Sequence, residues 1–287
     1  MDLRKFELKV DKDRLLIDFL KYRGISNRKI KELVKNGYVK YLNRSLKLKD
    51  KLKENQIIEI YIENENIDYA PIYGDLDIFF ENDEFLVVYK KENLTINSAN
   101  QVSLANHLAY YFKKNNIKSK VRFVNRIDYG TRGLVLVSKS SLIHGFLQNK
   151  LNEIIKREYI GVVRGKLEGS GRLEFNFEKG DSFKQVISKN GKKSITEYEV
   201  IESNEEYSLV KFNLITGRNH QIRASMNEIG HPLVGDSLYT NEDKESNYYL
   251  ISYKICAPDF LSGEVFNFEL DYRKSLKKYV YENLKNF

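Results

Sequence analysis

The chain has little of several residue types, and each shortage excludes a kind of structure or chemistry. Its 287 residues include one cysteine, three prolines and no tryptophan. The single cysteine, Cys256, excludes an internal disulfide bond and any zinc site built from several cysteines, and we expect it in the core or in a strand. The four histidines are scattered without the spacing of a metal-binding motif. The sequence therefore predicts neither a disulfide framework nor a metal site.

Long apolar runs are also absent. No stretch approaches the roughly 20 apolar residues that are needed to cross a bilayer. The first residues, M-D-L-R-K-F, lack the apolar region of a signal peptide. We therefore expect a soluble, cytoplasmic protein that does not enter a membrane. The length is sufficient for a sizeable core and an accessory domain.

Positive charge is in excess, and it is unevenly distributed. The whole chain carries a net charge of +8. Residues 1–62 contain 17 Lys and Arg against 9 Asp and Glu, while the rest of the chain has equal numbers of both signs. A compact cationic segment beside a neutral body predicts a domain that binds a polyanion. The alternative is an ordinary solvated surface in a lysine-rich chain.

Local patterns divide the chain into a basic domain over 1–62, a linker over 63–74 and a larger domain over 75–287. The linker is polar and contains one of the three prolines. In the basic domain we expect a helix over 13–22, a second helix from an N-cap at Ser26 to about Asn36 with Gly37 ending it, and strands at 38–42 and 56–62, joined by a turn at 43–45.

The larger domain is rich in segments that read as strands. Strands are expected on either side of a turn at 81–84 and at 134–137, 156–165, 194–201, 208–215 and 264–270, and helices at 103–116 and 143–153. This mixture predicts an α+β fold in which antiparallel strands predominate.

The most informative segment runs from Asn125 to Lys139, N-R-I-D-Y-G-T-R-G-L-V-L-V-S-K. Asp128 lies between Arg126 and a glycine-containing turn, immediately before an apolar strand. A carboxylate kept ionised beside fixed cations can act as a nucleophile or a base. Taken alone, the segment can equally be a polar turn that opens a buried strand.

A second dense motif favours the catalytic interpretation of Asp128 over a simple polar turn. It covers residues 217–239 and reads G-R-N-H-Q-I-R-A-S-M-N-E-I-G-H-P-L-V-G-D-S-L-Y. Together the two motifs resemble the RluA-type pseudouridine synthases, which carry H-R-L-D-x-x-T-S-G-L and later G-R-x-H-Q-I-R-x-H followed by G-x-P-I-x-G-D-x-x-Y. The later pattern matches at Gly217, Arg218, His220, Gln221, Ile222, Arg223, Gly230, Pro232, Gly235, Asp236 and Tyr239. The resemblance implies the α+β synthase fold and isomerisation of uridine in RNA, with no metal and no organic cofactor.

The resemblance also implies roles for individual residues. Asp128 corresponds to the essential carboxylate, which either attacks carbon 1′ of the uridine or abstracts a sugar proton. Arg223 corresponds to its ion-pair partner, Tyr159 to the aromatic that stacks on the target base, and Arg126 to an arginine that enters the RNA where the base leaves. Without the resemblance, each of these residues reads as an ordinary ion-pair, core or surface residue. His220 suits acid–base chemistry, but the resemblance favours a structural role.

The chain departs from the family pattern in four places. Asn125 replaces a histidine, Arg132 replaces the serine of T-S-G, and Ser225 replaces the histidine after I-R-x. The segment Lys90–Leu94 stands where K-P-x-G is usual, which leaves the shape of that loop open. None of these changes removes a residue assigned to the chemistry, and Arg132 adds a cation that we expect near the RNA.

The order helix, helix, strand over residues 12–60 resembles the small RNA-binding domain of the S-four ribosomal-protein type. In that family the second helix and the adjacent loop form a basic ledge for phosphates. The matching candidates here are Arg28, Lys29, Lys31, Lys35, Lys40 and Arg44. Such contacts contribute affinity and salt dependence rather than sequence choice.

The sequence thus predicts an RNA pseudouridine synthase that acts on structured RNA as a monomer, with large-subunit ribosomal RNA the first expectation and tRNA the second. One rival is a non-catalytic RNA-binding or ribosome-assembly factor that keeps the synthase fold. Another is a glycosidase acting on nucleosides, which needs a second carboxylate for acid–base work. No comparable motif supplies that carboxylate.

Overall fold

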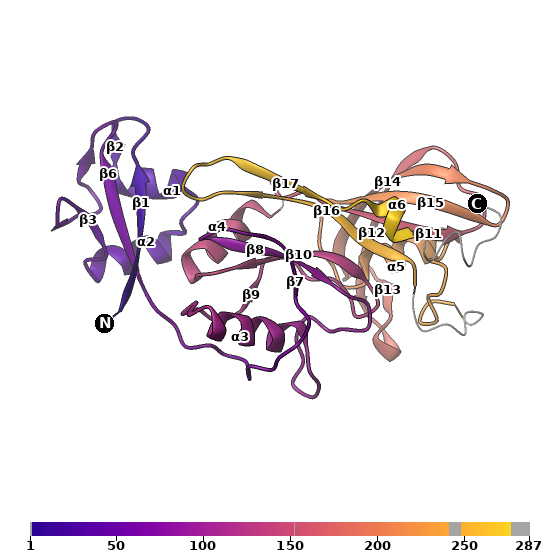
Figure 1. Cartoon of the computed structure of the whole chain (residues 1–287). Coiled ribbons are helices and arrows are strands. Elements are labelled where there is room, and N and C mark those ends of the chain that lie inside the picture. Colours follow the sequence, from indigo (N-terminus) through magenta and orange to yellow (C-terminus); the bar gives the residue numbers. More distant parts are fainter. Residues whose placement is uncertain (1, 152, 241–247, 277–287) are drawn as a thin grey trace.

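A small sheet and a large sheet lie side by side and are joined by an extended strap (Figure 1). The structure is a computed structural model, and it describes residues 2–151, 153–240 and 248–276. Among these residues, no helix is both long and apolar enough to span a bilayer.

The small sheet is built by the N-terminal residues and has the order β1-β6-β3-β4, with all pairs antiparallel. Its strands are β1 (Leu3–Lys9), β6 (Ile57–Glu63), β3 (Val39–Tyr41) and β4 (Arg44–Ser45), beside the short pair β2 (Arg14–Leu15) and β5 (Lys51–Leu52). Two helices, α1 (Leu16–Tyr22) and α2 (Asn27–Lys35), bury their apolar faces in the same core.

The predicted cap and end of the second helix are confirmed, but the turn predicted at 43–45 is wrong in its extent, because Arg44 and Ser45 pair with β3 as strand β4. The Ser26 side chain accepts a hydrogen bond from the N–H of Lys29 and caps α2. Gly37 follows the helix with a φ of 69°, in the left-handed region. The first helix begins later than expected because Arg14 and Leu15 pair with β5. Strand β1 was not predicted.

The large sheet has eleven strands, and its main path has the order β13-β12-β14-β15-β11-β16-β10-β8-β7. Its strands are β7 (Asp77–Glu81), β8 (Phe85–Lys90), β9 (Arg122–Phe123), β10 (Arg132–Ser138), β11 (Arg157–Arg164), β12 (Ser170–Lys179), β13 (Gln185–Ile187), β14 (Lys192–Ser203), β15 (Tyr207–Leu214), β16 (Leu250–Pro258) and β17 (Val265–Glu269). Strand β16 lies between β11 and β10, and its pairing with β10 is parallel while the other named pairs are antiparallel. The α+β expectation is confirmed.

Helices cover this sheet sparsely. They are α3 (Leu104–Lys114), α4 (Ser141–Lys150), α5 (Gln221–Glu228), α6 (Tyr272–Leu276) and a 3₁₀ turn at Asp181–Phe183. The predicted strands and the helices at 103–116 and 143–153 are present with shifted ends. Strands β12, β13 and β16 and helix α5 were not predicted. Cys256 is buried in β16, as expected.

The turn between β16 and β17, residues 259–264, joins the two sheets (Figure 1). Phe260 is fully buried, with its ring centroid 6.4 Å from that of Phe6 and 5.2 Å from that of Phe146. The Arg23 guanidinium donates to the carbonyl oxygens of Phe260 and Leu261. One apolar core therefore runs from the small sheet into the large one.

The predicted linker packs against the larger part of the molecule and is held there by side-chain contacts. Residues 64–76 contain no helix or strand. Glu65 forms a two-pronged ion pair with Arg122 at 2.6 and 2.7 Å, and the Asn106 amide donates to the carbonyl of Ala70 at 3.0 Å. The domain boundaries at 62 and 74 remain a prediction.

Candidate active site

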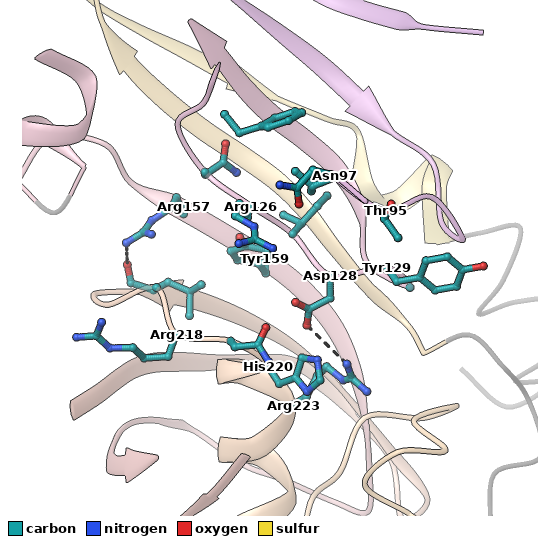
Figure 2. Close-up of a pocket in the computed structure, with 18 of the residues that line it drawn as sticks. Thr95, Asn97, Arg126, Asp128, Tyr129, Arg157, Tyr159, Arg218, His220 and Arg223 are labelled. Atoms are coloured by element: carbon teal, nitrogen blue, oxygen red, sulfur yellow. Dashed lines mark hydrogen bonds and ion pairs between the residues drawn. The ribbon is translucent and has the colours of Figure 1, made fainter. Parts of the chain in front are cut away.

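A cavity of about 650 Å³ opens between the loop before β10, the start of β11 and the loop that leads into α5 (Figure 2). It is lined by the four residues to which the sequence assigned chemistry: Arg126, Asp128, Tyr159 and Arg223. These residues come from segments up to a hundred positions apart, so the fold brings the two motifs together. The volume is within the range of pockets that hold a small organic ligand.

Asp128 projects from a turn whose backbone is held on both sides. The N–H of Thr131 donates to the Asp128 carbonyl at 3.1 Å, which closes the turn. The next carbonyl, that of Tyr129, accepts from the Lys90 ammonium at 3.1 Å and from the N–H of Asn93 at 3.0 Å. The Asp128 side chain is 24% exposed, and it reaches the cavity while its backbone stays fixed.

Lys90 is fully buried at the end of β8 and ties two loops together. Its ammonium also donates to the carbonyls of Lys91 and Leu94, at 2.9 and 2.7 Å. Burial lowers the pKa of Lys90 to about 8, although Asp128 and Glu92 oppose this shift. Asn93 stands at the position of the family glycine and has a φ of 59°, a conformation that Asn tolerates better than most residues. The altered loop thus keeps the backbone turn that the glycine serves.

Arg223, in the first turn of α5, is held by two carboxylates of unequal strength. Its Nε and one Nη donate to Asp236 at 2.8 and 2.7 Å, and its other Nη lies 3.6 Å from the Asp128 carboxylate. The guanidinium carbon is 4.2 Å from the centroid of the Tyr248 ring. Burial disfavours the charged guanidinium, but the hydrogen bonds to Asp236 outweigh this effect and raise the pKa of Arg223.

This geometry refines the predicted pairing of Arg223 with Asp128. Asp236 is 1% exposed and forms the bidentate ion pair. Asp128 receives only the longer contact, so its carboxylate remains accessible to a ligand in the cavity. The sequence analysis listed Asp236 only as a motif match and missed this role. Its position in the G-D-x-x-Y pattern was the only available signal.

Tyr159 and Arg126 line the cavity in different settings. Tyr159 lies on β11, opposite Ser252 of β16 and Phe212 of β15, and is 5% exposed. Burial raises the pKa of Tyr159, so its phenol is protonated at neutral pH. Arg126 is exposed at the same cavity. Figure 2 shows both side chains beside Asp128.

His220 precedes α5 with a φ of 51°, an uncommon conformation for this residue type. Its Nδ1 lies 3.4 Å from the hydroxyl of Tyr239, and burial lowers the pKa of the imidazole. Gln221 fixes the start of the helix, because its side chain accepts from the N–H of Arg218 and donates to the carbonyl of Ile195, both at 2.9 Å. His220 lines the cavity, and its structural role remains a prediction.

The three single-residue departures from the family pattern are all buried. Asn125 accepts from the N–H of Leu136 at 2.7 Å and braces β10. Ser225 lies in the buried face of α5. Arg132 is 7% exposed and 3.8 Å from Glu92. The expectation that Arg132 adds a cation beside the RNA is therefore wrong, because its side chain points into the loop after β8 and does not line the cavity.

Three further cavity residues had no distinct signal in the sequence. Arg157 is buried on β11 and donates to the carbonyl of Leu214 at 3.4 Å. Tyr248 supplies the ring against Arg223, and Gly130 approaches that ring so closely that a Cβ there would lie 2.9 Å from it. Arg218, which the second motif contains, donates to the carbonyl of Lys193. With Arg126 and Arg223, these arginines make the cavity cationic.

The six basic candidates of the N-terminal domain lie on α2, β3 and β4, and the cavity lining does not include them. Lys29 pairs with Glu32 at 2.5 Å and Arg44 with Asp50 at 3.0 Å, whereas Arg28, Lys31 and Lys35 are exposed on α2. Their role in binding RNA remains a prediction.

Comparison with known proteins agrees with this site. The sheet and cavity define an α+β protein with a cationic pocket that contains the Asp128 carboxylate. The family model for RNA pseudouridylate synthase matches residues 84–228, which include both Asp128 and Arg223. The chain belongs to this family and is an RNA pseudouridine synthase.

Several relatives and one solved structure have the same description. An uncharacterized RNA pseudouridine synthase of Bacillus subtilis, YhcT, is 36% identical over 64% of this chain and 64% of its own length. The ribosomal large subunit pseudouridine synthase D of Blochmanniella floridana is 30% identical over 85% of this chain and 75% of its own. Human RNA pseudouridylate synthase domain containing 1 shares the fold, with a TM-score of 0.58 and 24% identity over 68% of this chain and 83% of that one.

Proposed function

We propose that the chain converts specific uridines of structured RNA into pseudouridine, with large-subunit ribosomal RNA as its substrate and Asp128 as the essential carboxylate. The observation that carries this proposal is the position of the Asp128 side chain. It lies at the cavity wall, 3.6 Å from a guanidinium that Asp236 holds in place. A fixed cation at this distance can orient the carboxylate without covering it.

The proposed reaction needs no added atoms. The bond between N1 and carbon 1′ breaks, the uracil turns, and a bond from carbon 5 to carbon 1′ forms, while carbon 5 gives up its proton and N1 takes one up. Asp128 supplies the carboxylate for this exchange at the sugar. Tyr159 presents an aromatic face to a base that has left its stack. Arg126, exposed at the cavity, is placed to hold the RNA at the point from which the base came.

The substrate class rests on two further observations. Several relatives are named ribosomal large subunit pseudouridine synthase D, and one of them matches over 85% of this chain. The N-terminal domain also carries the excess positive charge. Phosphate contacts from Arg28, Lys31 and Lys35 on α2 would add affinity for a folded RNA outside the cavity. tRNA is the second candidate substrate.

Tritium release tests the proposal directly. RNA labelled with tritium at carbon 5 of uridine loses its label when carbon 5 is bonded to the sugar. We expect wild-type protein to release tritium from unmodified large-subunit ribosomal RNA and not from tRNA. Asp128→Asn keeps the size of the side chain and removes its charge, so we expect release to fall by about 10³-fold or more while RNA affinity stays within about twofold of wild type.

Two outcomes would overturn parts of this proposal separately. Release by Asp128→Asn at the wild-type rate would remove Asp128 from the chemistry. Release from tRNA alone would replace the substrate class and leave the role of Asp128 intact.

A further inference from the structure

The β12–β13 hairpin ends in an aromatic side chain that faces solvent. Phe183 closes the 3₁₀ turn and is 71% exposed. Its φ of 67° lies in the left-handed region, which a bulky residue rarely adopts. The Lys179 ammonium lies 4.8 Å from the ring centroid. One exposed apolar residue is ordinary on a protein surface. The neighbours of Phe183 and its place beside the cavity set it apart.

Lysines surround this aromatic side chain. Residues 179–193, which we name the basic hairpin segment, contain five lysines and one aspartate. Lys193 pairs with Glu174 at 2.8 Å. Lys184, Lys189 and Lys192 form no ion pair with a carboxylate in the part of the chain that the structure describes. Their charges are therefore available to an anionic partner.

The basic hairpin segment is bonded to the cavity wall at two points. The N–H of Gln185 donates to the Tyr239 hydroxyl at 2.9 Å, and that hydroxyl contacts the imidazole of His220, which lines the cavity. Near the other end, the carbonyl of Lys193 accepts from Arg218, another lining residue, at 2.9 Å. A chain that enters the cavity therefore passes within reach of these lysines.

An aromatic side chain among lysines suits unpaired nucleotides. Bases of any sequence stack on an exposed ring, while ammonium groups hold the phosphates between them. A protein partner is the alternative, because β13 is an edge strand with Val186 and Ile187 exposed on it. Lys184 and Lys189 flank this edge strand, and charges there discourage pairing with another strand. The charge and the adjoining cavity favour RNA.

We propose that the basic hairpin segment is an RNA-binding site beside the catalytic cavity. Phe183 stacks on an unpaired base near the target uridine, and Lys184, Lys189 and Lys192 bind the neighbouring phosphates. This inference rests on the proposed function, since the nucleotides in question belong to the RNA whose uridine enters the cavity. It adds a requirement for single-stranded nucleotides beside the target.

Substitution of Phe183 tests the stacking. Phe183→Asn removes the ring at a position whose positive φ suits Asn, so folding is preserved. We expect its dissociation constant for unmodified large-subunit ribosomal RNA to rise about fivefold or more, with the single-turnover rate at saturating enzyme unchanged. Phe183→Trp retains a stacking surface, and we expect wild-type binding. Phe183→Leu keeps an apolar side chain without a ring and should bind as weakly as Phe183→Asn.

Salt dependence tests the phosphate contacts. Replacing Lys184, Lys189 and Lys192 together by Gln should reduce the slope of log K against log salt by about 2, because each contact with a single strand contributes about 0.7. The matched control replaces Lys113, Lys114 and Lys120, which are exposed and lie outside the cavity lining, by Gln. It should leave the slope unchanged. A short single-stranded oligouridine should show the same differences in affinity as the ribosomal RNA.

The proposal is overturned if the Phe183 and triple-lysine variants bind both RNAs as wild type does. Aggregation of the triple variant under those conditions would assign the lysines to protection of the sheet edge. Because binding is measured without turnover, these results stand even if no tritium is released. Loss of tritium release with normal RNA binding would instead contradict the catalytic proposal.

Discussion

The Arg223 side chain contacts two carboxylates, one that fixes its position and one that faces the cavity. Two of its nitrogens are saturated by Asp236, which is buried, and a third reaches toward Asp128, which is not. The Tyr248 ring limits movement from one side. Since buried guanidinium groups need good hydrogen-bond geometry to offset desolvation, we expect Asp236 to be required to keep Arg223 in place and aimed at the cavity.

Asp236→Asn should therefore slow catalysis indirectly, through the orientation of Arg223. The amide cannot offer two acceptors to the guanidinium, so Arg223 loses its fixed orientation. We expect the single-turnover rate of pseudouridine formation to fall about a hundredfold, and the free energy of unfolding to fall by about 3 kcal/mol. RNA affinity should remain near that of wild type. Rapid-mixing kinetics with tritiated RNA and denaturant titration would measure the two effects.

Asp75→Asn provides a matched control. Asp75 pairs with Lys91 at 2.5 Å but is 83% exposed, and such a pair contributes little to stability. We expect neither the rate of pseudouridine formation nor the free energy of unfolding to change measurably. A wild-type rate for Asp236→Asn would show that Arg223 needs no second carboxylate.

Among single residues, the sequence predicted the pairing of Arg223 with Asp128 but not its closer pairing with Asp236. Asp128, Tyr159 and Arg223 followed from motif positions, because residue type and spacing are visible in the chain. The division of Arg223 between Asp236 and Asp128 depends on distances of 2.7 and 3.6 Å, which no spacing encodes. The burial of Arg132 was mispredicted for the same reason, since its pairing with Glu92 arises from a separate loop.

Among the larger elements, the 259–264 turn depends on a buried carboxylate. Glu84 is 1% exposed, and its two oxygens accept from the N–H groups of Phe260 and Leu261 at 2.7 and 2.9 Å. Burial raises the pKa of Glu84 from its ordinary value of 4.5 to about 7, and nearby Asp259 contributes in the same direction. The turn is therefore held by a group that titrates in the neutral range.

The sign of the resulting pH dependence follows from these values. The folded state retains a proton on Glu84 that the unfolded chain releases between about pH 4.5 and 7, so this contribution to stability is complete below pH 4.5. It is lost as the pH rises to about 7, by about 3 kcal/mol at most. Chemical denaturation of wild type and Glu84→Gln at a series of pH values would measure it.

Glu84→Gln should lack this loss, because the amide keeps an acceptor and does not ionise. Glu264→Gln, an exposed change in the same turn, should retain the wild-type dependence. Parallel stability curves for wild type and Glu84→Gln would contradict the assignment of Glu84.

Strands in which apolar and polar residues alternate were predictable from the sequence. Elements that are buried on nearly every side were not. Strands β14 and β15 alternate apolar and polar residues, and both were found. Strand β16 is buried along nearly its whole length in the middle of the sheet, so its sequence lacks alternation. Helix α5 has six buried residues out of eight, and these include the polar residues Gln221 and Arg223. Because polar residues occupy its buried face, the sequence lacks the periodic apolar pattern of a helix.

The molecule as a whole is held together by one apolar core across both sheets. Phe260 contributes a fully buried ring between Phe6 of the small sheet and Phe146 of helix α4, which packs in the same core. The Asn149 amide adds a hydrogen bond of 2.8 Å to the carbonyl of Gly24. The N-terminal domain is thus held in a defined position relative to the catalytic cavity.

Phe260→Ala should weaken this connection selectively. Removal of a fully buried aromatic side chain costs about 3–5 kcal/mol. We expect calorimetry to show one unfolding transition for wild type and two for the variant, because the small sheet loses its support while the large one keeps its own core. Leu261→Ala, in the same turn but 39% exposed, should leave a single transition. One transition at the wild-type temperature for Phe260→Ala would refute a shared core.

Sequence patterns could identify two parts of the molecule but not their fixed arrangement. Phe6, Phe146 and Phe260 lie in three distant segments, and each reads as an ordinary apolar residue in its local context. Charge and motif content separated a basic part from a catalytic part because those properties are summed along the chain. The contact between the parts depends on shape complementarity, which appears only after folding.

Strand β16 also bears on how the protein matures during translation. It lies between β10, which follows the Asp128 turn, and β11, which carries Tyr159, yet the ribosome makes it long after both. A nascent chain that has not reached Leu250 lacks the strand that holds these halves of the cavity side by side. At about 5–20 residues per second, the last strands follow within seconds. We therefore expect the two halves of the cavity to come together only late in synthesis.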